Sequence, residues 1–322
     1  MTVPLVRRCC PVCGPDGDPR PFAAADVNVS ALGRFAFASR KEPEYMHWRL
    51  WECRRCDVLY ADPAPDPDWL RQRYREADFA SGVEAAYAAR TYALLLNKVL
   101  NRLPDRNGAV DIGAGDGAFL TELVGAGFNE VWGIEPSAAP VAAAAPSVRC
   151  LLRQDVFRPG LLPPEHFRLV SCFQTIEHAS DPLGICREAL RLLKPGGVFL
   201  VVAHNRRACS AWLLGRRSPI YDVEHLQLFS RSSLRHLLRT AGFCEFPVRT
   251  LLNCYPLSYW ARLLPLPAAL KRSLQALLKG LALERFAVPL PAGNLAAFAF
   301  KSLSGSAQEF LVSTRTNHGG SA

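Results

Sequence analysis

Two cysteine pairs near the start of the chain have the spacing of a metal site. Cys10 and Cys13 form one C-x-x-C pair, and Cys53 and Cys56 form a second. Each pair turns back on itself and can supply two thiolates to one ion, so that four sulfurs surround it tetrahedrally. Because four sulfur ligands leave no open coordination position, this pattern predicts a structural Zn²⁺. Free buried cysteines, which behave as small hydrophobic residues, are the alternative.

A glycine-rich turn in the middle of the chain has the features of a cofactor site. The segment reads Val110-Asp111-Ile112-Gly113-Ala114-Gly115-Asp116-Gly117. Its glycines let the backbone bend sharply and let a ligand lie against bare main chain. The spacing is G-x-G-x-G rather than the G-x-G-x-x-G of dinucleotide sites, and Asp111 and Asp116 would repel a pyrophosphate. S-adenosylmethionine has a cationic sulfonium, an amino group and no phosphate, so it suits these carboxylates.

Two later carboxylates indicate the nucleoside part of that cofactor. Glu135, followed by Pro136, ends a second apolar run and can accept hydrogen bonds from both ribose hydroxyls. An NAD site would also have an acid here, so Glu135 indicates a nucleoside without naming it. Asp155 would hold an adenine amino group, with Val156 in the apolar wall beside the ring. A solvated loop residue is the alternative for Asp155.

Short apolar runs alternate with helical patterns from Ala109 onward, and these elements must position the site. We expect strands at 109–112, 131–134, 169–173 and 198–203, and helices at 68–74, 83–103, 117–125, 140–145, 182–193 and 230–240. This alternation predicts an α/β fold with a parallel sheet covered on both faces. Ligands of such sheets bind outside the carboxyl ends of the strands, where the glycine turn and Glu135 would lie.

The chain divides into zones of different composition. We expect a zinc-ribbon module at 1–62, a hinge and N-terminal helices at 63–104, a cofactor-binding domain at 105–303 with a helical cover at 251–290, and a C-terminal tail at 304–322. Prolines between Asp62 and Pro67 predict a stiff spacer. In the cover, a Leu-rich stretch carries Lys271, Arg272 and Lys279. It is predicted to cover the active site as a lid, to make peripheral contact with a membrane that carries a lipid-linked glycan, or only to pack on the core as a helical cover.

Composition narrows the class of protein. The 322 residues are 49% apolar and 21% charged, which is typical of a globular protein and excludes disorder. The net charge of +9 suits an anionic substrate, RNA or an acidic lipid surface without choosing among them. No signal peptide or membrane span is visible, which predicts a cytoplasmic location. In that reducing compartment the paired cysteines indicate metal rather than disulfides.

The chain resembles, over about Val83 to Lys301, the class I S-adenosylmethionine-dependent methyltransferases. The resemblance is carried by VDIGAGDGAFL, GIEPS, RQDVF, FQTIEHASDPLGICREALRLLKPGG and EHLQLFSRSSLRHLLRTAGF. It implies a doubly wound, Rossmann-like, mostly parallel seven-stranded sheet whose last strand, Ala296 to Lys301, runs antiparallel beside its neighbour. It also implies a set of cofactor contacts: Asp111, Gly113 and Gly115 at the methionine end, Glu135 at the ribose, Asp155 at the adenine and Gln174 near the methyl group.

A zinc ribbon joined to this domain is similar to bacterial enzymes that modify sugars and polysaccharides, including deoxysugar C-methyltransferases. The resemblance implies a sugar, nucleotide-sugar or glycan acceptor. In those enzymes an acid–His pair after a strand assists proton abstraction, and Glu224 and His225 match that type. His225 is therefore predicted as the general base, Tyr221 as a substrate contact and His178 as a further catalytic candidate. A role in bracing the loop is the alternative for both histidines.

Two other functions stay open. An RNA methyltransferase would use the zinc ribbon and its basic residues (Arg20, Arg34, Arg40 and Lys41) to bind nucleic acid. A catalytically silent protein would keep the fold and bind the cofactor only. The intact Asp111, Gly113, Gly115 and Glu135 argue against the silent protein, because a dead site has no physical need of them.

Overall fold

The computed structural model describes residues 2–38, 44–79, 82–264 and 266–303. The tail predicted at 304–322 lies outside them. The strands are β1 (Leu5–Val6), β2 (Pro19–Ala23), β3 (Leu50–Cys53), β4 (Leu59–Ala61), β5 (Ala64–Pro65), β6 (Ala109–Ile112), β7 (Val131–Glu135), β8 (Leu152–Gln154), β9 (Phe167–Phe173), β10 (Leu193–His204), β11 (Gln227–Leu228), β12 (Val248–Pro256) and β13 (Ala287–Phe300). The helices are α1 (Pro67–Glu76), α2 (Gly82–Asn97), α3 (Ala118–Gly125), α4 (Ala138–Ala143), α5 (Pro146–Arg149), α6 (Pro182–Leu192), α7 (Cys209–Leu214), α8 (Arg231–Ala241), α9 (Leu257–Leu263) and α10 (Ala268–Gly280).

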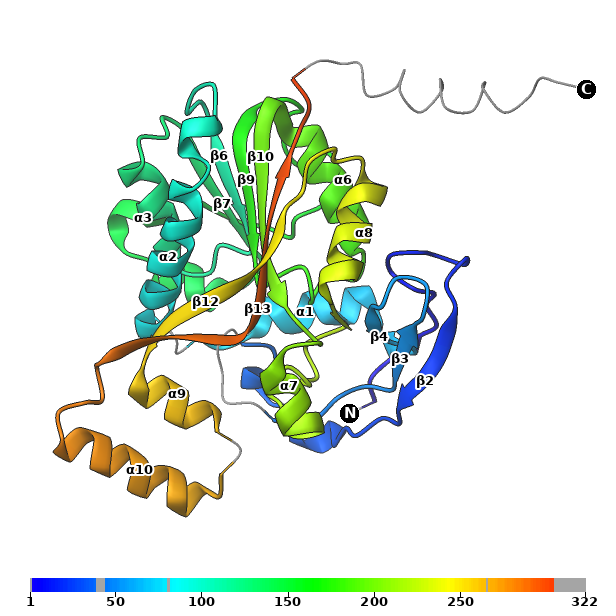
Figure 1. The fold of residues 1–322 in the computed structure, drawn as a ribbon, viewed down its shortest axis with the longest axis vertical. Helices are drawn as coiled ribbons and strands as arrows, with labels where there is room; N and C mark the ends of the chain where they lie inside the picture. The colour runs from blue at the N-terminus through cyan, green and yellow to red at the C-terminus, as the bar shows by residue number, and fades with distance from the viewer. Residues whose placement is uncertain (1, 39–43, 80–81, 265, 304–322) are drawn as a thin grey trace, which may run out of the picture.

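A seven-stranded sheet forms the centre of the molecule, in the order β12-β13-β10-β9-β6-β7-β8 (Figure 1). The five strands from β10 to β8 are mutually parallel, whereas β13 is antiparallel to both β10 and β12. The sheet is therefore mixed, and the predicted antiparallel last strand is confirmed. That strand is longer than expected because its first half, from Ala287, pairs with β12 beyond the end of β10.

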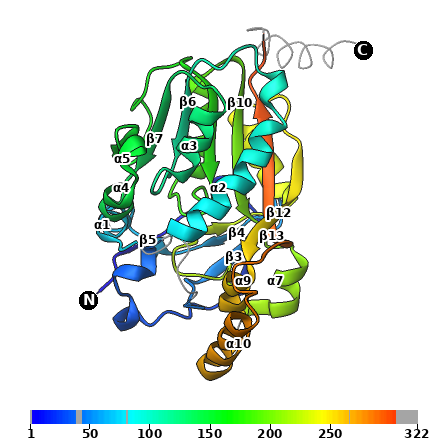
Figure 2. The same ribbon diagram turned by 90° about the vertical axis from the view of Figure 1, so that its left-hand side faces the viewer.

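Helices cover both faces of the sheet, which is why its inner strands are almost entirely buried. The residues of β6 are all buried, and Val198 to Ala203 of β10 are fully so. Helices α2 and α3 lie on one side, and α6 and α8 on the other (Figures 1 and 2). Asp181 caps α6 by accepting a hydrogen bond from the Gly184 N–H at 2.8 Å. The doubly wound α/β architecture is thus present.

The segment predicted as a stiff spacer is instead part of the N-terminal structure. Ala64 and Pro65 form β5, which pairs antiparallel with β1, and Ala64 is buried. Asp66 then caps α1 through the Asp68 and Trp69 N–H groups. Proline suits the edge of so short a strand, because it lacks only the outward N–H.

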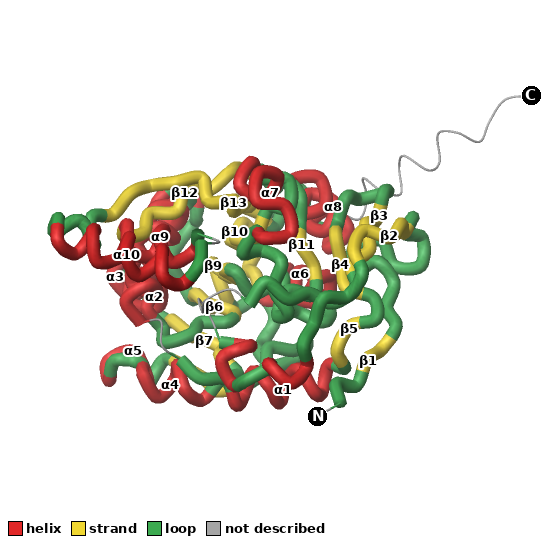
Figure 3. The backbone as a smooth tube through the Cα atoms, turned by 90° about the horizontal axis from the view of Figure 1, so that it is seen from below, coloured by secondary structure: helices red, strands yellow, loops and turns green. Residues whose placement is uncertain are grey.

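The N-terminal module and the main domain share a sheet. β11, which lies between β10 and α8 in the chain, pairs antiparallel with β4 and so completes a four-stranded sheet in the order β11-β4-β3-β2 (Figure 3). A buried ion pair adds to this junction: Arg206 Nη2 lies 2.7 Å from Glu52 Oε1, and both side chains are 4% exposed. The Trp48 indole N–H also donates to the Val223 carbonyl at 2.7 Å.

The cover predicted at 251–290 is helical only in its middle. Residues 251–256 belong to β12 and 287–290 to β13, which pair as a two-stranded extension, for example Tyr255 with Val288. Helices α9 and α10 follow each other between these strands and project beyond the end of the sheet (Figures 1 and 2). A ladder at the edge of an existing sheet satisfies backbone groups that a purely helical cover would have to satisfy alone.

Candidate functional site

The carboxyl ends of the parallel strands open into one cavity of about 1260 Å³. Its wall contains the glycine turn after β6, the end of β7, the residues after β9 and β10, and parts of α1, α2 and α9. Single-ligand pockets usually measure roughly 300–1,000 Å³. The cavity therefore has room for a cofactor and an acceptor together.

The three glycines of the turn have different roles. Gly113 has a φ of +76°, and a Cβ there would overlap the Thr175 side chain. Gly115 also has a positive φ, of +58°, but among the described residues no atom lies within 4 Å of where its Cβ would stand. This open space is what a ligand lying on the main chain requires. Gly117, predicted as a cofactor contact, does not line the cavity; it begins α3 and packs against Val148.

The carboxylates of the turn give the site a negative character. Asp111 is buried, lines the cavity, and accepts a hydrogen bond from the Ser171 hydroxyl at 2.6 Å. Asp116 accepts from the Ala118 N–H at 3.3 Å, so a carboxylate already occupies the start of α3. A phosphate would be repelled there. These residues fit a cofactor that is cationic and has no phosphate.

Glu135 closes the turn from the neighbouring strand. Its carboxylate accepts hydrogen bonds from the Gly115 N–H at 2.9 Å and from the Ser137 N–H at 2.8 Å. Burial raises the pKa of Glu135, and these two N–H groups oppose the rise. Pro136 and Ala114 lie on the same wall of the cavity. A carboxylate held in this way is ready to accept further hydrogen bonds from vicinal hydroxyls.

The predicted adenine contacts also line the cavity. Asp155 accepts from the Val156 N–H at 2.8 Å and from Arg158 Nη1 at 2.7 Å. The bond from the Arg158 guanidinium lowers the pKa of the Asp155 carboxyl. Asp155 is therefore an ionised, paired residue of the wall, and its contact with adenine stays a prediction.

Gln174 follows β9 and has a positive φ of 49°, an uncommon conformation for a residue other than glycine. Its Oε1 accepts from the Tyr92 hydroxyl at 3.2 Å, and the Tyr92 ring stacks on Phe173 with centroids 4.1 Å apart. Strained backbone of this kind clusters at functional sites. Tyr92 was not predicted, because on α2 it looks like any other apolar position of a helix.

Two predicted catalytic histidines and a glutamate come together at the far end of the cavity. His178 Nδ1 lies 3.6 Å from Glu224 Oε2, and His225 Nε2 lies 3.9 Å from Glu224 Oε1. His225 Nδ1 is 2.8 Å from the Ile220 carbonyl, so this nitrogen carries the proton of the neutral ring. His225 Nε2 is then the unprotonated ring nitrogen, and it lies on the side of Glu224. Tyr74 adds a hydroxyl 3.2 Å from His178 Nδ1.

His204 joins this group and was missed by the sequence analysis. Burial lowers its pKa to about 4, so its ring is neutral at pH 7, and its Nδ1 lies 2.8 Å from Asn294 Oδ1. Its ring centroid is 4.8 Å from that of His225. A polar residue at the carboxyl end of a buried strand was the available signal. Asn253, also on the wall, is buried, and its Oδ1 has no partner among the described residues.

Tyr221 is not a substrate contact of this cavity, contrary to the prediction. Its side chain is buried against the N-terminal module, where its ring stacks with Phe22 and meets His47 edge-on, each at 6.2 Å. The apolar body of the ring is better placed there than in a polar site.

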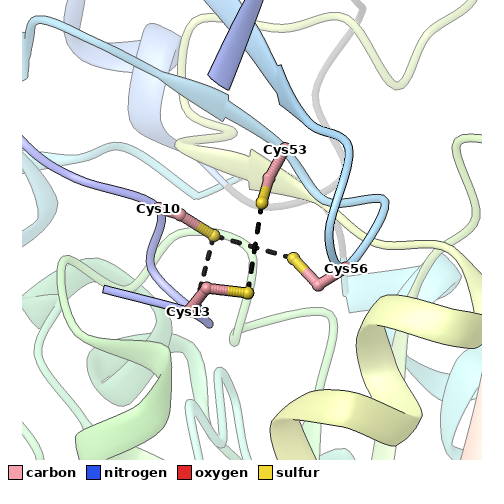
Figure 4. A group of neighbouring side chains, drawn as sticks. All are labelled: Cys10, Cys13, Cys53 and Cys56. Carbon is pink, nitrogen blue, oxygen red and sulfur yellow. Dashed lines mark hydrogen bonds between the residues drawn. The ribbon is translucent and has the colours of Figure 1, made fainter. Parts of the chain in front are cut away.

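The four paired cysteines form one cluster (Figure 4). Cys10 Sγ is 3.6 Å from Cys56 Sγ, and Cys13 Sγ is 4.0 Å from Cys53 Sγ. A tetrahedron with Zn–S bonds of about 2.3 Å has edges of about 3.8 Å, so the sulfurs fit such an ion. Donor atoms of His178, Glu224 and His225 also lie within 4.8 Å of one another, and imidazole with carboxylate is a donor set that divalent ions accept.

Comparison with known proteins identifies the class of the main domain. Residues 85–244 match the family model described as "Methyltransferase domain". A protein of Mycolicibacterium smegmatis named "Probable S-adenosylmethionine-dependent methyltransferase" is 31% identical over 161 residues, which are 50% of this chain and 60% of that protein. The chain therefore contains a class I S-adenosylmethionine-dependent methyltransferase domain, in agreement with the sequence motifs.

The chain is also similar to a second curated enzyme and to a solved structure. The ubiquinone biosynthesis O-methyltransferase of Marinobacter nauticus is 32% identical over 106 residues, 30% of this chain and 44% of that enzyme. Among solved structures, an S-adenosylmethionine-dependent methyltransferase of Thermotoga maritima has 21% identity and a TM-score of 0.45, over 69% of this chain and 93% of that one. The chain spans 60% of the length of the Mycolicibacterium protein and 44% of that of the Marinobacter enzyme, less than two thirds of either. The described residues contain no helix long and apolar enough to cross a membrane.

Proposed function

We propose that the protein transfers the methyl group of S-adenosylmethionine to a small acceptor, namely a sugar, a nucleotide sugar or a glycan intermediate. The observation that carries this proposal is the single cavity, which joins the glycine turn and its carboxylates to the His178–Glu224–His225 group. A cofactor on the turn and an acceptor near the histidines would share one enclosed space. Alignment of the two reactants is the main task of an enzyme of this kind.

The bound cofactor would supply a methyl carbon already activated by its sulfonium. Asp111 would hold the ammonium of the methionine part, and Glu135 would accept hydrogen bonds from the ribose hydroxyls. Gly115 would leave the main chain bare beneath it. None of these residues needs to move a proton, because their role would be to bind the cofactor and to orient it.

His225 would take the proton of the acceptor. Its Nδ1–H is fixed by the Ile220 carbonyl, so Nε2 is the nitrogen that can accept. Glu224, 3.9 Å from Nε2, would stabilise the imidazolium that forms. A tautomer fixed by a backbone carbonyl suits a base and a metal ligand alike. We assign this group to proton transfer because the sulfonium already activates the methyl carbon, whereas the acceptor still has a proton to lose.

The polar residues around this group suit an acceptor rich in hydroxyls. Asn253 presents a buried Oδ1 without a partner, which a hydroxyl could satisfy. Asp222 and Asn294 line the same region. A buried acceptor left unpaired costs roughly 1–3 kcal/mol, so a donor from the substrate would be favoured there.

We further propose that the cysteine cluster holds a structural Zn²⁺ that braces the loop carrying Glu224 and His225. β11 begins at Gln227, two residues after His225, and pairs with β4, and β4 follows the second cysteine pair. The N-terminal module would thereby position the catalytic loop.

An RNA substrate has less support, because basic residues of the N-terminal module are already paired. Arg20 bonds to Glu52 and Arg34 to Asp78. Arg40 and Lys41, which belonged to the predicted RNA surface, lie outside the described residues. Phosphate binding would have to compete with these carboxylates.

The decisive experiment follows labelled methyl from S-adenosylmethionine into host extract separated into small-molecule, glycolipid, RNA and protein pools. Label in the sugar or glycolipid pools supports the proposal. Label in RNA would replace it with the RNA methyltransferase. Cofactor binding without label in any pool would favour the catalytically silent protein.

Calorimetry of S-adenosylmethionine binding tests the proposed cofactor contacts. Asp111→Asn keeps the shape of the side chain and removes its charge, so we expect S-adenosylmethionine to bind about tenfold to a hundredfold more weakly, in line with about 1.5–3 kcal/mol for a charged hydrogen bond. Ser171→Ala, which removes only the partner hydroxyl, should have a smaller effect. Unchanged affinity in Asp111→Asn would contradict the assignment of this carboxylate.

A further inference from the structure

Helices α7, α9 and α10 lie toward one end of the molecule (Figures 1 and 2). The segments that contain them expose an unusual number of large apolar side chains. More than half of the large apolar side chains exposed among the described residues lie between 212 and 290. On α7, Trp212 is 84% exposed and Leu213 77%. On and after α10, Leu277 and Leu281 are each 58% exposed, and Phe286 is 62% exposed. We call these five residues, with Leu270, the exposed apolar surface.

Helix α10 is amphipathic but contributes no residue to the core. None of its residues is buried, although Leu270, Leu274 and Leu277 recur at helical spacing and Leu281 continues the same stripe. An apolar stripe on a surface helix normally faces the core of its own protein. Of this stripe only Leu274 is half-buried, and the other three leucines are exposed. Lys271 and Leu278, which lie beside the stripe, are also half-buried.

The charges around this surface are mostly positive, and Glu284 is the one acidic residue between 257 and 290. Lys271, Arg272 and Lys279 lie on α10, and Arg285 follows it. Arg216 and Arg217 follow α7, and both are exposed. No Asp or Glu occurs from 209 to 221 or from 257 to 283. A basic polar face combined with Trp, Phe and Leu on the other is the signature of a helix that lies in the interface of an anionic membrane.

The same elements form the outer wall of the cavity. Leu214 of α7 and Leu263 of α9 line it, and Leu264 and Leu290 both line it and are exposed at the surface. Leu264 and Leu290 therefore place apolar side chains both at the surface and in the cavity wall. An acceptor with a polar head and an apolar tail could keep its head beside the histidines while its tail lies against these leucines.

We propose that the exposed apolar surface docks on an anionic phospholipid bilayer, and that the methyl acceptor is an amphiphile held in that bilayer. The nature of the acceptor rests on the proposed function, whereas the docking on a bilayer does not. The occupant is a lipid surface rather than a second copy of the chain, because two copies would bring their like charges on α10 together.

Vesicle flotation tests the docking directly, without cofactor or acceptor. The protein should float with phosphatidylcholine vesicles that contain phosphatidylglycerol, more weakly at high salt, and not with phosphatidylcholine alone. Each Lys or Arg near such a surface contributes about 1 kcal/mol, or about fivefold. The triple variant K271Q/R272Q/K279Q should therefore partition on the order of a hundredfold more weakly.

Matched variants distinguish binding through the exposed apolar surface from an effect of overall net charge and from dimerisation. R187Q/R235Q/R239Q removes the same charge from α6 and α8, and it should lose far less binding. L277S/L281S should abolish flotation, whereas V124S, at an exposed apolar position of α3, should not. No flotation of the natural protein, equal losses in both triple variants, or a dimer that L277S/L281S dissociates would each overturn the proposal.

Methyl transfer to a soluble acceptor keeps the two proposals distinguishable. The surface variants lie outside the cavity wall, so their cofactor binding and soluble activity should be unchanged. Loss of label transfer only when the acceptor is presented in vesicles supports the docked arrangement. Flotation without methyl transfer to any acceptor would support the docking proposal and contradict the proposed function.

Discussion

At the scale of the residue, Glu177 stands out because it is a fully buried carboxyl group beside the histidines that we propose as catalytic. One of its oxygens accepts from the His204 N–H at 3.1 Å, and the other has no partner among the described residues. Burial raises the pKa of Glu177 from 4.5 to about 8. The native protein therefore holds a proton here that the unfolded chain releases.

The pH dependence of stability follows from that proton. The stabilisation is complete below pH 4.5 and is lost as the pH rises to about 8, at about 1.4 kcal/mol per pH unit. Glu177→Gln has no such proton, so its free energy of unfolding should fall less than that of the natural protein between pH 6 and pH 8. Urea denaturation at both pH values measures this, and parallel changes in the two proteins would refute the assignment.

His225 gives the second prediction at this scale. His225→Gln removes the base but keeps a side chain able to hydrogen-bond to the Ile220 carbonyl, so kcat should fall by about 10²- to 10⁴-fold. The Kd of S-adenosylmethionine should stay within about threefold, because a residue that acts only on the acceptor's proton adds no binding energy for the cofactor. His178→Gln serves as the comparison. A loss of kcat in His178→Gln that exceeds that in His225→Gln would move the base to His178.

The site residues that the sequence predicted are those with a local signature. Asp111 and Glu135 end apolar strands and precede glycine or proline, so their place at the sheet edge follows from the pattern alone. Tyr74, Tyr92 and Asn253 have no such signature, because they reach the cavity from a helix or from a distant strand. Tyr221 was misplaced since its neighbours Asp222 and Glu224 do line the cavity while its own ring turns away.

At the scale of the element, helices with explicit caps were the most predictable. Asp181 with Pro182, and Ser230 with Gly242, fix the ends of α6 and α8 to within a residue of the expected bounds. The strands β8 and β12 were missed. β8 is a three-residue edge strand that is mostly exposed, and β12 runs into a Leu-rich stretch that has no clear period of two.

The junction between β4 and β11 yields the prediction at this scale. Replacing two sulfurs in C53S/C56S should remove the bound zinc, loosen β3 and β4, and release the loop before β11. We expect kcat to fall on the order of a hundredfold through misplacement of His225, with the Kd of S-adenosylmethionine changed far less. Metal content by mass spectrometry, kcat and calorimetry measure the three effects together.

The control for this variant uses two exposed cysteines outside the cluster. C150S/C244S should retain zinc and kcat. Loss of zinc in C53S/C56S with no change in kcat would show that the N-terminal module is only a stabilising appendage.

At the scale of the whole molecule, the sequence could predict the type of central sheet but not which distant segments surround the cavity at the carboxyl ends of its strands. Strand order follows from motif resemblance, and the cavity near the glycine turn follows from the order. One cavity is lined by α1, β10, β12 and the loop before β11. This arrangement depends on packing between segments that lie far apart in the chain. The net charge is a similar case. The value of +9 from the sequence gives only its sign, and the fold was needed to show that some of the basic residues lie beside exposed leucines.

The shared sheet also bears on the order in which the chain acquires its structure during synthesis. Tyr60 and Leu59 leave the ribosome early, yet their partners, Gln227 and Leu228, emerge only after most of the main domain has been made. Until then β4 has an unpaired edge, and such edges invite pairing with other chains. A metal bound early by the four cysteines would hold this nascent segment compact while it waits, so zinc supply during translation should govern how much of the protein escapes aggregation.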